Sequence, residues 1–387
     1  MEKIGNLFIN LIKSEINPAQ AQEVVLPSDI ASLSKLYALA KRHDLAHFVG
    51  YVISKRKEPL DGSVLDKFEE EQRTAVYRYE NMQFELSEIR KAFENAKIPF
   101  IPLKGARLRD LYAQPWLRTS CDIDILVKES DLQRAVTVLT EEKQYVVQGD
   151  KQFHDVSLFA PSRVHLELHF NLLENRENID GLLSRVWEYC APVQENGAEY
   201  EQSNEFFLFH LIAHLYYHFI SGGCGVRPLL DIWLVERNFA LDREKFNEML
   251  DLCGIRTFYE QISYLAEVWF SDKPHTDLTL KLQKYIFQGG VYGTTENKIA
   301  VKKARGENKR GYIWKRIFMP YSALKHKYPV LQKHKWLTPF YEVRRWFEII
   351  FTKRAHKLQR EMRAYDAIDD DCKEATAQLL RELDIQE

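Results

Sequence analysis

The spacing of apolar positions divides the chain into a helical start, an alternating middle and a longer helical remainder. Apolar side chains recur at helical spacing through residues 1–95, and the stretch 63–96 is a long, charged helical pattern without Pro or Gly. Two segments then alternate with period two, "CDIDILV" at 121–127 and "VHLELHF" at 164–170, which predicts strands. Further strands are predicted at 97–105, 145–148 and 155–160, and a helix at 130–144.

The helical remainder begins at about residue 203. Helices are predicted at 204–220, 227–238, 242–251, 257–270, 278–286 and 366–384, whereas 289–311 is expected to be an exposed loop. The predicted fold class is therefore α+β, with a small mixed-sheet α/β core between helical flanks. The expected regions are 1–95 (helical), 96–200 (the α/β core), 201–290 (helical, completing a cleft) and 291–387 (helical, basic and rich in aromatic residues).

Composition limits the class of protein. The chain has 387 residues, 45% of them hydrophobic and 28% charged, as expected for a globular protein of two or three domains. Its five cysteines are widely spread without a C-x-x-C pair, which favours reduced thiols over a disulfide framework or a cysteine zinc site. No stretch approaches the roughly 20 apolar residues of a membrane helix, and the first residues lack the apolar core of a signal peptide. We therefore expect a cytoplasmic enzyme or binding protein without a membrane span.

Charge is unevenly distributed along the chain. Residues 301–364 contain 18 Lys and Arg against 4 Glu, so this segment carries +14 and the remainder −16 of the total of −2. The segment can face nucleic acid or a membrane, or it can be a solvated helical surface docked on the acidic part of the chain. Its interleaved aromatic residues can stack on single-stranded RNA or anchor the segment to the body. We favour anchoring, by Trp314, Phe318, Tyr321 and Trp336.

The candidate chemistry starts at Asp122 and Asp124. At positions i and i+2 of a strand the two carboxylates share one face, about 7 Å apart along the strand. Such a pair suits divalent metal ions, because Mg²⁺ (or Mn²⁺) prefers hard oxygen ligands. The pair alone also fits a surface strand with a polar face.

A third carboxylate lies on the second alternating strand. His165, Glu167 and His169 share one face, so Glu167 would join the two aspartates if this strand pairs beside 121–127. Three clustered carboxylates repel one another unless metal ions neutralise them. The two histidines are expected to orient neighbouring groups rather than to bind metal. The alternative is an edge hairpin with a polar outer face.

A glycine turn and two cations precede the first aspartate. In "PLKGARLRDLY", Gly105 at a strand-to-helix turn would let a phosphate approach the backbone and the helix N-terminus, and Lys104 adds a positive charge. Arg118, four residues before Asp122, can reach the same side. The P-loop pattern G-x-x-x-x-G-K is absent. Lys-Gly alone is not specific, whereas the whole combination within about 65 residues is far more so.

These segments together resemble a known family. "IPFIPLKGARLRDLY", "LRTSCDIDILV" and "VHLELHF" are similar to a poorly characterised nucleotidyltransferase family of the DNA polymerase beta-like superfamily. The resemblance covers most of the chain, with the specific part at 98–170. It includes "LYALAKRHDLAHFV", "HLIAHLYYH" and "RPLLDIWLV" and, more weakly, part of the basic segment. The usual Gly-Ser turn of the superfamily is Lys104-Gly105 here, and the third carboxylate is Glu rather than Asp.

The resemblance implies a metal-dependent transferase whose catalytic core is 96–200. A nucleoside monophosphate would move from an NTP, such as ATP, to a hydroxyl of a small molecule, sugar, protein or RNA, with release of pyrophosphate. One Mg²⁺ or Mn²⁺ would orient the β and γ phosphates and a second would activate the acceptor hydroxyl, so no covalent enzyme intermediate is needed. The implied catalytic and metal-binding residues are Asp122, Asp124 and Glu167, and the implied triphosphate-binding residues are Lys104, Gly105 and Arg118.

Two more candidates lie in the helical half. His210, His214 and His218 line one stripe of a helix, which can bind zinc, point into a cleft or pack on the core, although H-E-x-x-H is absent. We choose His214 as a nucleotide-binding residue because the resemblance includes it. Arg227 can pair with Asp231 at i,i+4, or it can bind nucleotide phosphate while Asp231 holds its guanidinium.

Two other functions fit some of these residues. A metal-dependent glycosyltransferase also uses Asp-x-Asp to hold the metal of a nucleotide-sugar, and a nucleotide- or RNA-binding module needs no catalysis. The strand of Glu167 and the Lys104-Gly105 turn favour nucleotidyl transfer over glycosyl transfer. The presence of all three carboxylates argues against a loss of catalysis.

Overall fold

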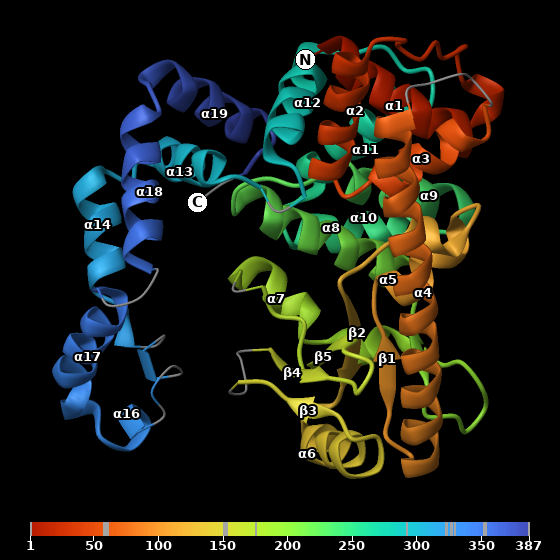
Figure 1. Ribbon diagram of the computed structural model, residues 1–387. Helices are drawn as coiled ribbons and strands as arrows, with labels where there is room; N and C mark the ends of the chain where they lie inside the picture. Colours follow the sequence, from red (N-terminus) through yellow and green to blue (C-terminus); the bar gives the residue numbers. More distant parts are fainter. Residues whose placement is uncertain are drawn as a thin grey trace.

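The protein consists of helices arranged around a small mixed sheet (Figure 1). The computed structural model describes residues 2–56, 62–149, 154–174, 176–291, 293–321, 324–325, 328, 330–350 and 354–385. The predicted α+β class with helical flanks is confirmed. Among the described residues, none of the helices has both the length and the apolar character needed to cross a bilayer.

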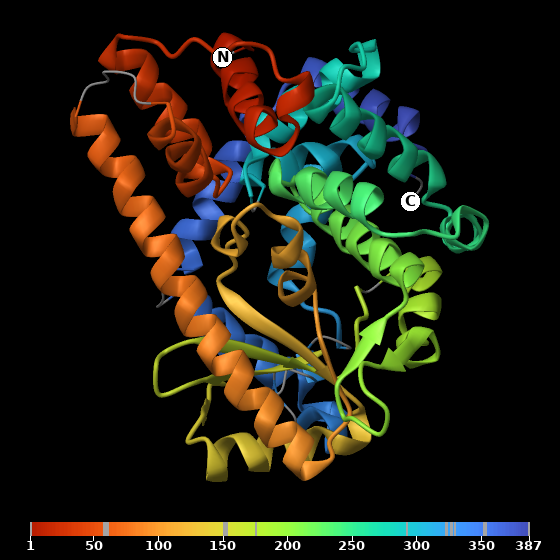
Figure 2. The ribbon, with the colours of Figure 1, turned by 90° about the vertical axis from the view of Figure 1, so that its right-hand side faces the viewer.

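Four helices precede the sheet. They are α1 (Glu2–Ile16), α2 (Ile30–Arg42), α3 (Ala46–Ser54) and α4 (Gly62–Ala96). Because 63–96 contains neither Pro nor Gly, α4 continues without a break for 35 residues. Its first half packs against the other N-terminal helices and its second half runs along the sheet (Figure 2). α4 therefore connects the helical part to the α/β core.

The sheet has five strands in the order β1-β2-β5-β4-β3. They are β1 (Phe100–Pro102), β2 (Asp122–Val127), β3 (Val146–Val147), β4 (Asp155–Phe159) and β5 (His165–His169). β2 and β5 are parallel, and every other neighbouring pair is antiparallel. A parallel pair needs a crossover, which α6 (Leu132–Thr137) and the β3–β4 hairpin provide.

The alternation along β2 and β5 gives the sheet two different faces. The apolar face is buried against α4 and α6; it comprises Ile123, Ile125 and Val127 of β2 and Leu166 and Leu168 of β5. The polar residues of both strands consequently lie on the other face, away from α4.

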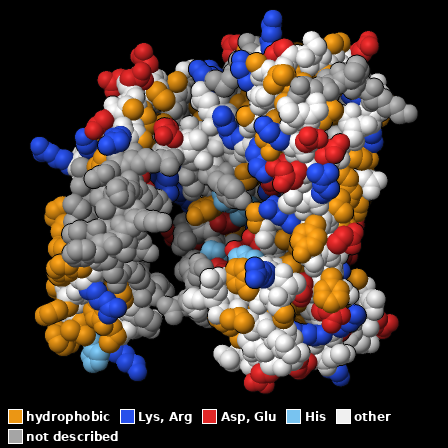
Figure 3. Space-filling view, viewed as in Figure 1, with side chains coloured by type: hydrophobic (Ala, Val, Ile, Leu, Met, Phe, Trp, Pro, Cys, Tyr) orange, Lys and Arg blue, Asp and Glu red, His pale blue; other side chains and the backbone are white. Residues whose placement is uncertain are grey.

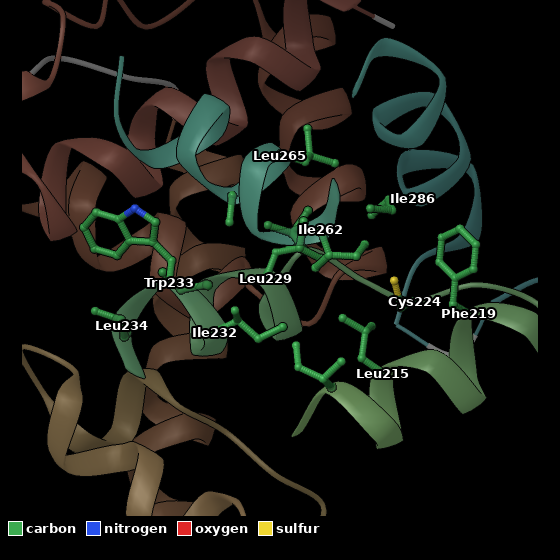
Figure 4. Packing of buried hydrophobic residues seen from close by; sticks show 14 of the residues in the cluster. Leu215, Phe219, Cys224, Leu229, Ile232, Trp233, Leu234, Ile262, Leu265 and Ile286 are labelled. Carbon is green, nitrogen blue, oxygen red and sulfur yellow. The ribbon is translucent and has the colours of Figure 1, made fainter. Parts of the chain in front are cut away.

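A larger helical core follows the sheet. Its elements are α7 (Glu177–Leu183), the hairpin β6 (Cys190–Pro192) and β7 (Tyr200–Gln202), α8 (Asn204–Ile220), α9 (Arg227–Asn238), α10 (Arg243–Leu252), α11 (Arg256–Phe270) and α12 (Asp277–Gly289). Figure 4 shows how side chains of α8, α9, α11 and α12 interdigitate, among them Leu215, Phe219, Leu229, Ile232, Ile262 and Ile286. This packing fixes α8 and α9, which cover the polar face of the sheet.

The remaining helices form the C-terminal part. They are α13 (Thr295–Ala304), α14 (Lys309–Ile317), α16 (Val330–Lys333), α17 (Thr338–Ile350), α18 (Arg354–Ala367) and α19 (Asp370–Glu382). The expectation of an exposed loop over 289–311 is wrong, because α13 lies within it. Thr294 caps α13 by accepting from the Asn297 N–H, and burial of Ile299 and Val301 stabilises the helix.

The expected anchoring of the basic segment is wrong for Trp314 and Trp336. Both side chains are exposed, and Phe318 is exposed as well. The hydroxyl of Tyr321 donates to the Leu331 carbonyl at 2.8 Å, so this residue contacts its own neighbourhood. Trp314, Phe318 and Trp336 therefore do not anchor the segment, whereas Tyr312 is buried in a cluster with Ile299 and Tyr365.

Candidate active site

Three carboxylates meet on the polar face of the sheet. Asp122 and Asp124 lie on that face of β2, and Glu167 lies on that face of β5. Because the two strands are parallel neighbours, Asp124 stands opposite Glu167 and Asp122 stands opposite His165. β2 and β5 therefore pair as the sequence analysis required for Glu167 to join the two aspartates.

His169 holds two of these carboxylates. Its Nε2 lies 3.1 Å from Asp124 Oδ1 and 3.6 Å from Glu167 Oε2, and the ring is buried. The Nε2 of His165 contacts the hydroxyl of Ser157 at 2.6 Å. The two histidines thus contact neighbouring polar groups. His169, on the adjacent strand β5, orients the carboxylate of Asp124.

The carboxylates differ in their affinity for protons. Burial, together with the charges of Asp124 and Glu167, raises the pKa of Asp122 to about 6. Burial opposes ionisation of Asp124 too, but Lys104 and His169 outweigh it and hold the pKa of Asp124 well below its usual value. Burial opposes the charged form of His169, but its contacts with Asp124 and Glu167 outweigh burial and raise the pKa of His169 to about 9. Repulsion within the cluster opposes ionisation of all three carboxylates at once, so a bound cation would stabilise the fully ionised cluster.

Asp122→Asn is expected to stabilise the metal-free protein in a pH-dependent way. The folded-state pKa of Asp122, about 6, lies above the ordinary value of 3.8, so the folded protein binds more protons than the unfolded chain and loses stability as pH rises through 6. We expect the variant to exceed the wild type in unfolding free energy by roughly 1–3 kcal/mol at pH 8, and much less at pH 4. Urea unfolding in EDTA measures this, with Asp110→Asn, an exposed carboxylate, as control. An equal difference at both pH values would contradict the assignment.

Lys104 occupies the turn between β1 and α5 (Gly105–Leu108). Its φ of +36° is unusual for a residue with a side chain, and the Leu103 N–H donates to the Asp124 carbonyl at 2.9 Å, which fixes the turn beside β2. α5 is a single turn, so the expected contribution of a helix N-terminus to phosphate binding is not supported. A Cβ added at Gly105 would lie 3.5 Å or more from its neighbours, which is ordinary van der Waals contact, so packing within the protein does not itself require glycine at this position.

Arg118 forms a buried ion pair with Asp231. Its Nε donates to both carboxylate oxygens, at 2.9 and 3.0 Å, and the Tyr112 hydroxyl donates to the same group at 2.7 Å. All three residues are buried. The prediction that Asp231 pairs with Arg227 is therefore wrong, because α9 presents Asp231 to the segment that precedes β2.

Arg227 instead pairs with a residue far away in sequence. Its guanidinium donates to Asp44 at 2.6 Å and to the Thr119 carbonyl at 3.0 Å, and Thr119 donates to Asp44 at 3.1 Å. Arg227 is thereby fixed next to Arg118, and the N-terminal helices contribute to the site through Asp44.

A hydrogen-bonded chain of histidines lies beside Lys104. Lys104 Nζ is 3.4 Å from His214 Nε2, His214 Nδ1 is 2.8 Å from Glu174, and His218 Nε2 is 3.0 Å from His214 Nε2. Burial and the charge of Lys104 lower the pKa of both histidines. Sequence reasoning missed Glu174, which lies in the loop after β5. The i,i+4 spacing of His214 and His218 in the sequence had indicated that these two side chains lie on one face of the helix.

One cavity of about 300 Å³ brings the predicted residues together. It lies between the polar face of the sheet, the β1–α5 turn, α8 and α9, and Figure 3 shows histidine and acidic side chains within the hollow on one face of the molecule. All eight candidate residues line it, namely Lys104, Gly105, Arg118, Asp122, Asp124, Glu167, His214 and Arg227. His218 and Asp231 also line it, whereas His210 does not.

The donor set fits a hard divalent cation. Two groups of side chains have ligand atoms within 4.8 Å of one another, Asp122 with His165 and Glu167, and Asp124 with Glu167 and His169. Glu167 belongs to both groups, and the oxygen donors of the three carboxylates are those that Mg²⁺ and Mn²⁺ prefer. The part of the chain that the structure describes shows no such group around His210, His214 and His218.

Comparison with known proteins agrees with the chemistry of this cavity. A family model described as an uncharacterised nucleotidyltransferase matches residues 31–271, which is more than half of the chain and includes every residue of the cavity except Val291. No curated protein and no solved structure gives a significant match. The chain belongs to this family of uncharacterised nucleotidyltransferases.

Proposed function

We propose that the protein transfers a nucleoside monophosphate from an NTP to a hydroxyl acceptor and requires Mg²⁺ or Mn²⁺. The observation that carries the proposal is a cavity in which three carboxylates, Asp122, Asp124 and Glu167, face the cation Lys104. Family membership supports the transferase class. Acidic residues for metal and a basic residue for phosphate are the two requirements of this chemistry.

The carboxylates would hold the metal. When bound, Mg²⁺ or Mn²⁺ neutralises phosphate charge and lowers the pKa of an acceptor hydroxyl. Asp124 and Glu167 are held in place by His169, so they are oriented before metal arrives. At or below about pH 6, Asp122 would release its proton when it binds metal, because its pKa is raised to about 6.

The cations would hold the triphosphate. Lys104 has no carboxylate within ion-pair distance among the described residues, so its charge is available to phosphate. Arg118 and Arg227 are oriented by Asp231 and Asp44, and each guanidinium has further N–H groups to donate. Glu174 would fix the ring of His214 so that its Nε2 faces Lys104 and His218.

Thermal unfolding with each NTP tests the proposal. We expect an NTP with Mg²⁺ or Mn²⁺ to raise the unfolding temperature, since a ligand at 100 times its dissociation constant stabilises the fold by about 2.7 kcal/mol. The double variant Asp122→Asn/Asp124→Asn should lose the metal-dependent part of the shift, whereas Asp110→Asn should keep it. A larger shift with nucleotide-sugars than with any NTP would indicate a glycosyltransferase. The absence of a shift with either class of ligand would contradict the proposal.

A further inference from the structure

Exposed aromatic side chains gather on one part of the molecule. We define the C-terminal arm as the described residues of 309–350, which include α14, α16 and α17. Five of the seven exposed Phe, Trp and Tyr side chains of the described residues lie on it, namely Trp314, Phe318, Trp336, Phe340 and Phe347. Figure 3 shows hydrophobic side chains along the outer edge of the arm, where Figure 1 places α14, α16 and α17. Such a concentration is unusual for a surface that faces only water.

α17 has an inner and an outer face. On the inner face, Glu342 and Arg345 are buried as an ion pair at 2.7 Å, and Tyr341 packs on Tyr328. On the outer face, Phe340, Val343 and Phe347 follow the spacing of one helical stripe and are 73%, 43% and 58% exposed. Trp336, in the turn before α17, is also 73% exposed. The arm thus has its own small core and displays a second apolar surface outward.

The same surface is strongly basic. Between residues 309 and 350 the sequence has ten Lys and Arg and two acidic residues, Glu342 and Glu348, a net charge of +8. The Glu342 carboxylate is buried against Arg345, so it offsets little of the charge of the surface. Lys333 and Lys335, immediately before Trp336, are both exposed. A binding partner must therefore accept apolar side chains and carry negative charge.

These features favour one partner over two others. A second copy of the chain would bring two basic surfaces together, which like-charge repulsion opposes. Single-stranded RNA binds in grooves where aromatic rings stack on bases, whereas the stripe on α17 lies on a convex helix and includes Val343, which cannot stack. An anionic membrane surface accepts Trp and Phe at the depth of its headgroups and attracts Lys and Arg.

We propose that the outer face of α17, with Trp336, docks on an anionic membrane surface. Trp336, Phe340, Val343 and Phe347 would enter the interfacial layer, and Lys333 and Lys335 would lie among the headgroups. None of the described helices crosses the bilayer in this arrangement. The proposal is independent of the chemistry in the cavity, because no residue of the arm lines that cavity.

Sedimentation with lipid vesicles tests the proposal. The full-length protein should bind vesicles of phosphatidylcholine with about 30% phosphatidylserine, bind vesicles of phosphatidylcholine alone much more weakly, and be released by salt. Trp336→Glu/Phe340→Glu should weaken binding at least tenfold, because both side chains are exposed apolar contacts. Phe84→Glu, which changes a side chain 64% exposed on α4, is the matched control and should bind as the wild type does.

Three results would overturn the proposal. The first is absence of wild-type binding to the anionic vesicles. The second is binding of a single-stranded oligonucleotide, such as oligouridine, that is lost in the arm variant while vesicle binding is unaffected. The third is a wild-type dimer in light scattering that the arm variant converts to a monomer. Unfolding temperatures of both variants should equal that of the wild type, since the substituted side chains are exposed.

Discussion

Asp124→Asn is expected to lower the rate of nucleotidyl transfer by about 10³-fold, equivalent to about 4 kcal/mol of transition-state stabilisation. Asp124 is the carboxylate whose pKa is held low by Lys104 and His169, so it is the one that is ionised and ready for metal at every pH of interest. The measurement is the initial rate of pyrophosphate release at saturating metal. The fold should be intact, because Asn fills the same volume.

Two further variants separate this effect from a general loss of structure. Asp110→Asn makes the same chemical change at an exposed position and should leave the rate unchanged. His169→Gln removes the charge that fixes Asp124 and should cost about 10–100-fold, which is typical of residues that orient a metal ligand. A rate for Asp124→Asn within a factor of ten of the wild type would exclude Asp124 as a metal ligand.

Asp231→Ala is expected to lower the free energy of unfolding by about 3–5 kcal/mol, the usual cost of removing one partner of a buried ion pair. It leaves the Arg118 guanidinium buried without its carboxylate and removes the acceptor of the Tyr112 hydroxyl. Chemical denaturation followed by tryptophan fluorescence measures the change, and Trp233 on the same helix provides a nearby probe.

A surface pair provides the matched control. Asp251 pairs with Arg256 on partly exposed helix ends, so Asp251→Ala should cost no more than about 1 kcal/mol. The double variant Arg118→Met/Asp231→Leu should recover much of the stability, because apolar side chains replace both charges. Equal costs for Asp231→Ala and Asp251→Ala would mean that burial of the first pair has no energetic consequence.

The sheet was predictable because its strands obey a simple physical pattern. Apolar and polar residues alternate along both strands, with Ile123, Ile125 and Val127 on β2 and Leu166 and Leu168 on β5. The alternation shows which face of each strand is buried. The sequence did not establish that β2 and β5 pair with each other, because their pairing and register depend on how both strands pack against α4. Once the pairing exists, the meeting of Asp124 and Glu167 follows.

Contacts between distant segments could not be predicted. Arg227 and Asp231 are four residues apart in one helix, which suggested that they pair with each other, yet Asp44 and Arg118 are their partners. Tertiary packing decided this, because α9 lies between the N-terminal helices and the segment before β2. Glu174 was missed for the same reason, as its loop has no periodic pattern.

α13 shows where local composition misleads. Glycines at 289, 290, 293, 306 and 311 surround it and suggested a loop. The Thr294 cap and the apolar residues Ile299 and Val301 were present in the sequence, but their weight comes from burial against other helices. Packing therefore outweighed the flanking turn residues.

A comparison of two labelled forms of one NTP tests nucleotidyl transfer itself. The protein, Mg²⁺ and a desalted cell extract as the source of acceptors are incubated with NTP labelled at the α or at the γ phosphorus. We expect label from the α position to become attached to an acceptor, pyrophosphate to appear in equal amount, and Asp122→Asn/Asp124→Asn to abolish both. Attachment of label from the γ position instead, or α label retained in free nucleotide only, would contradict the proposed reaction.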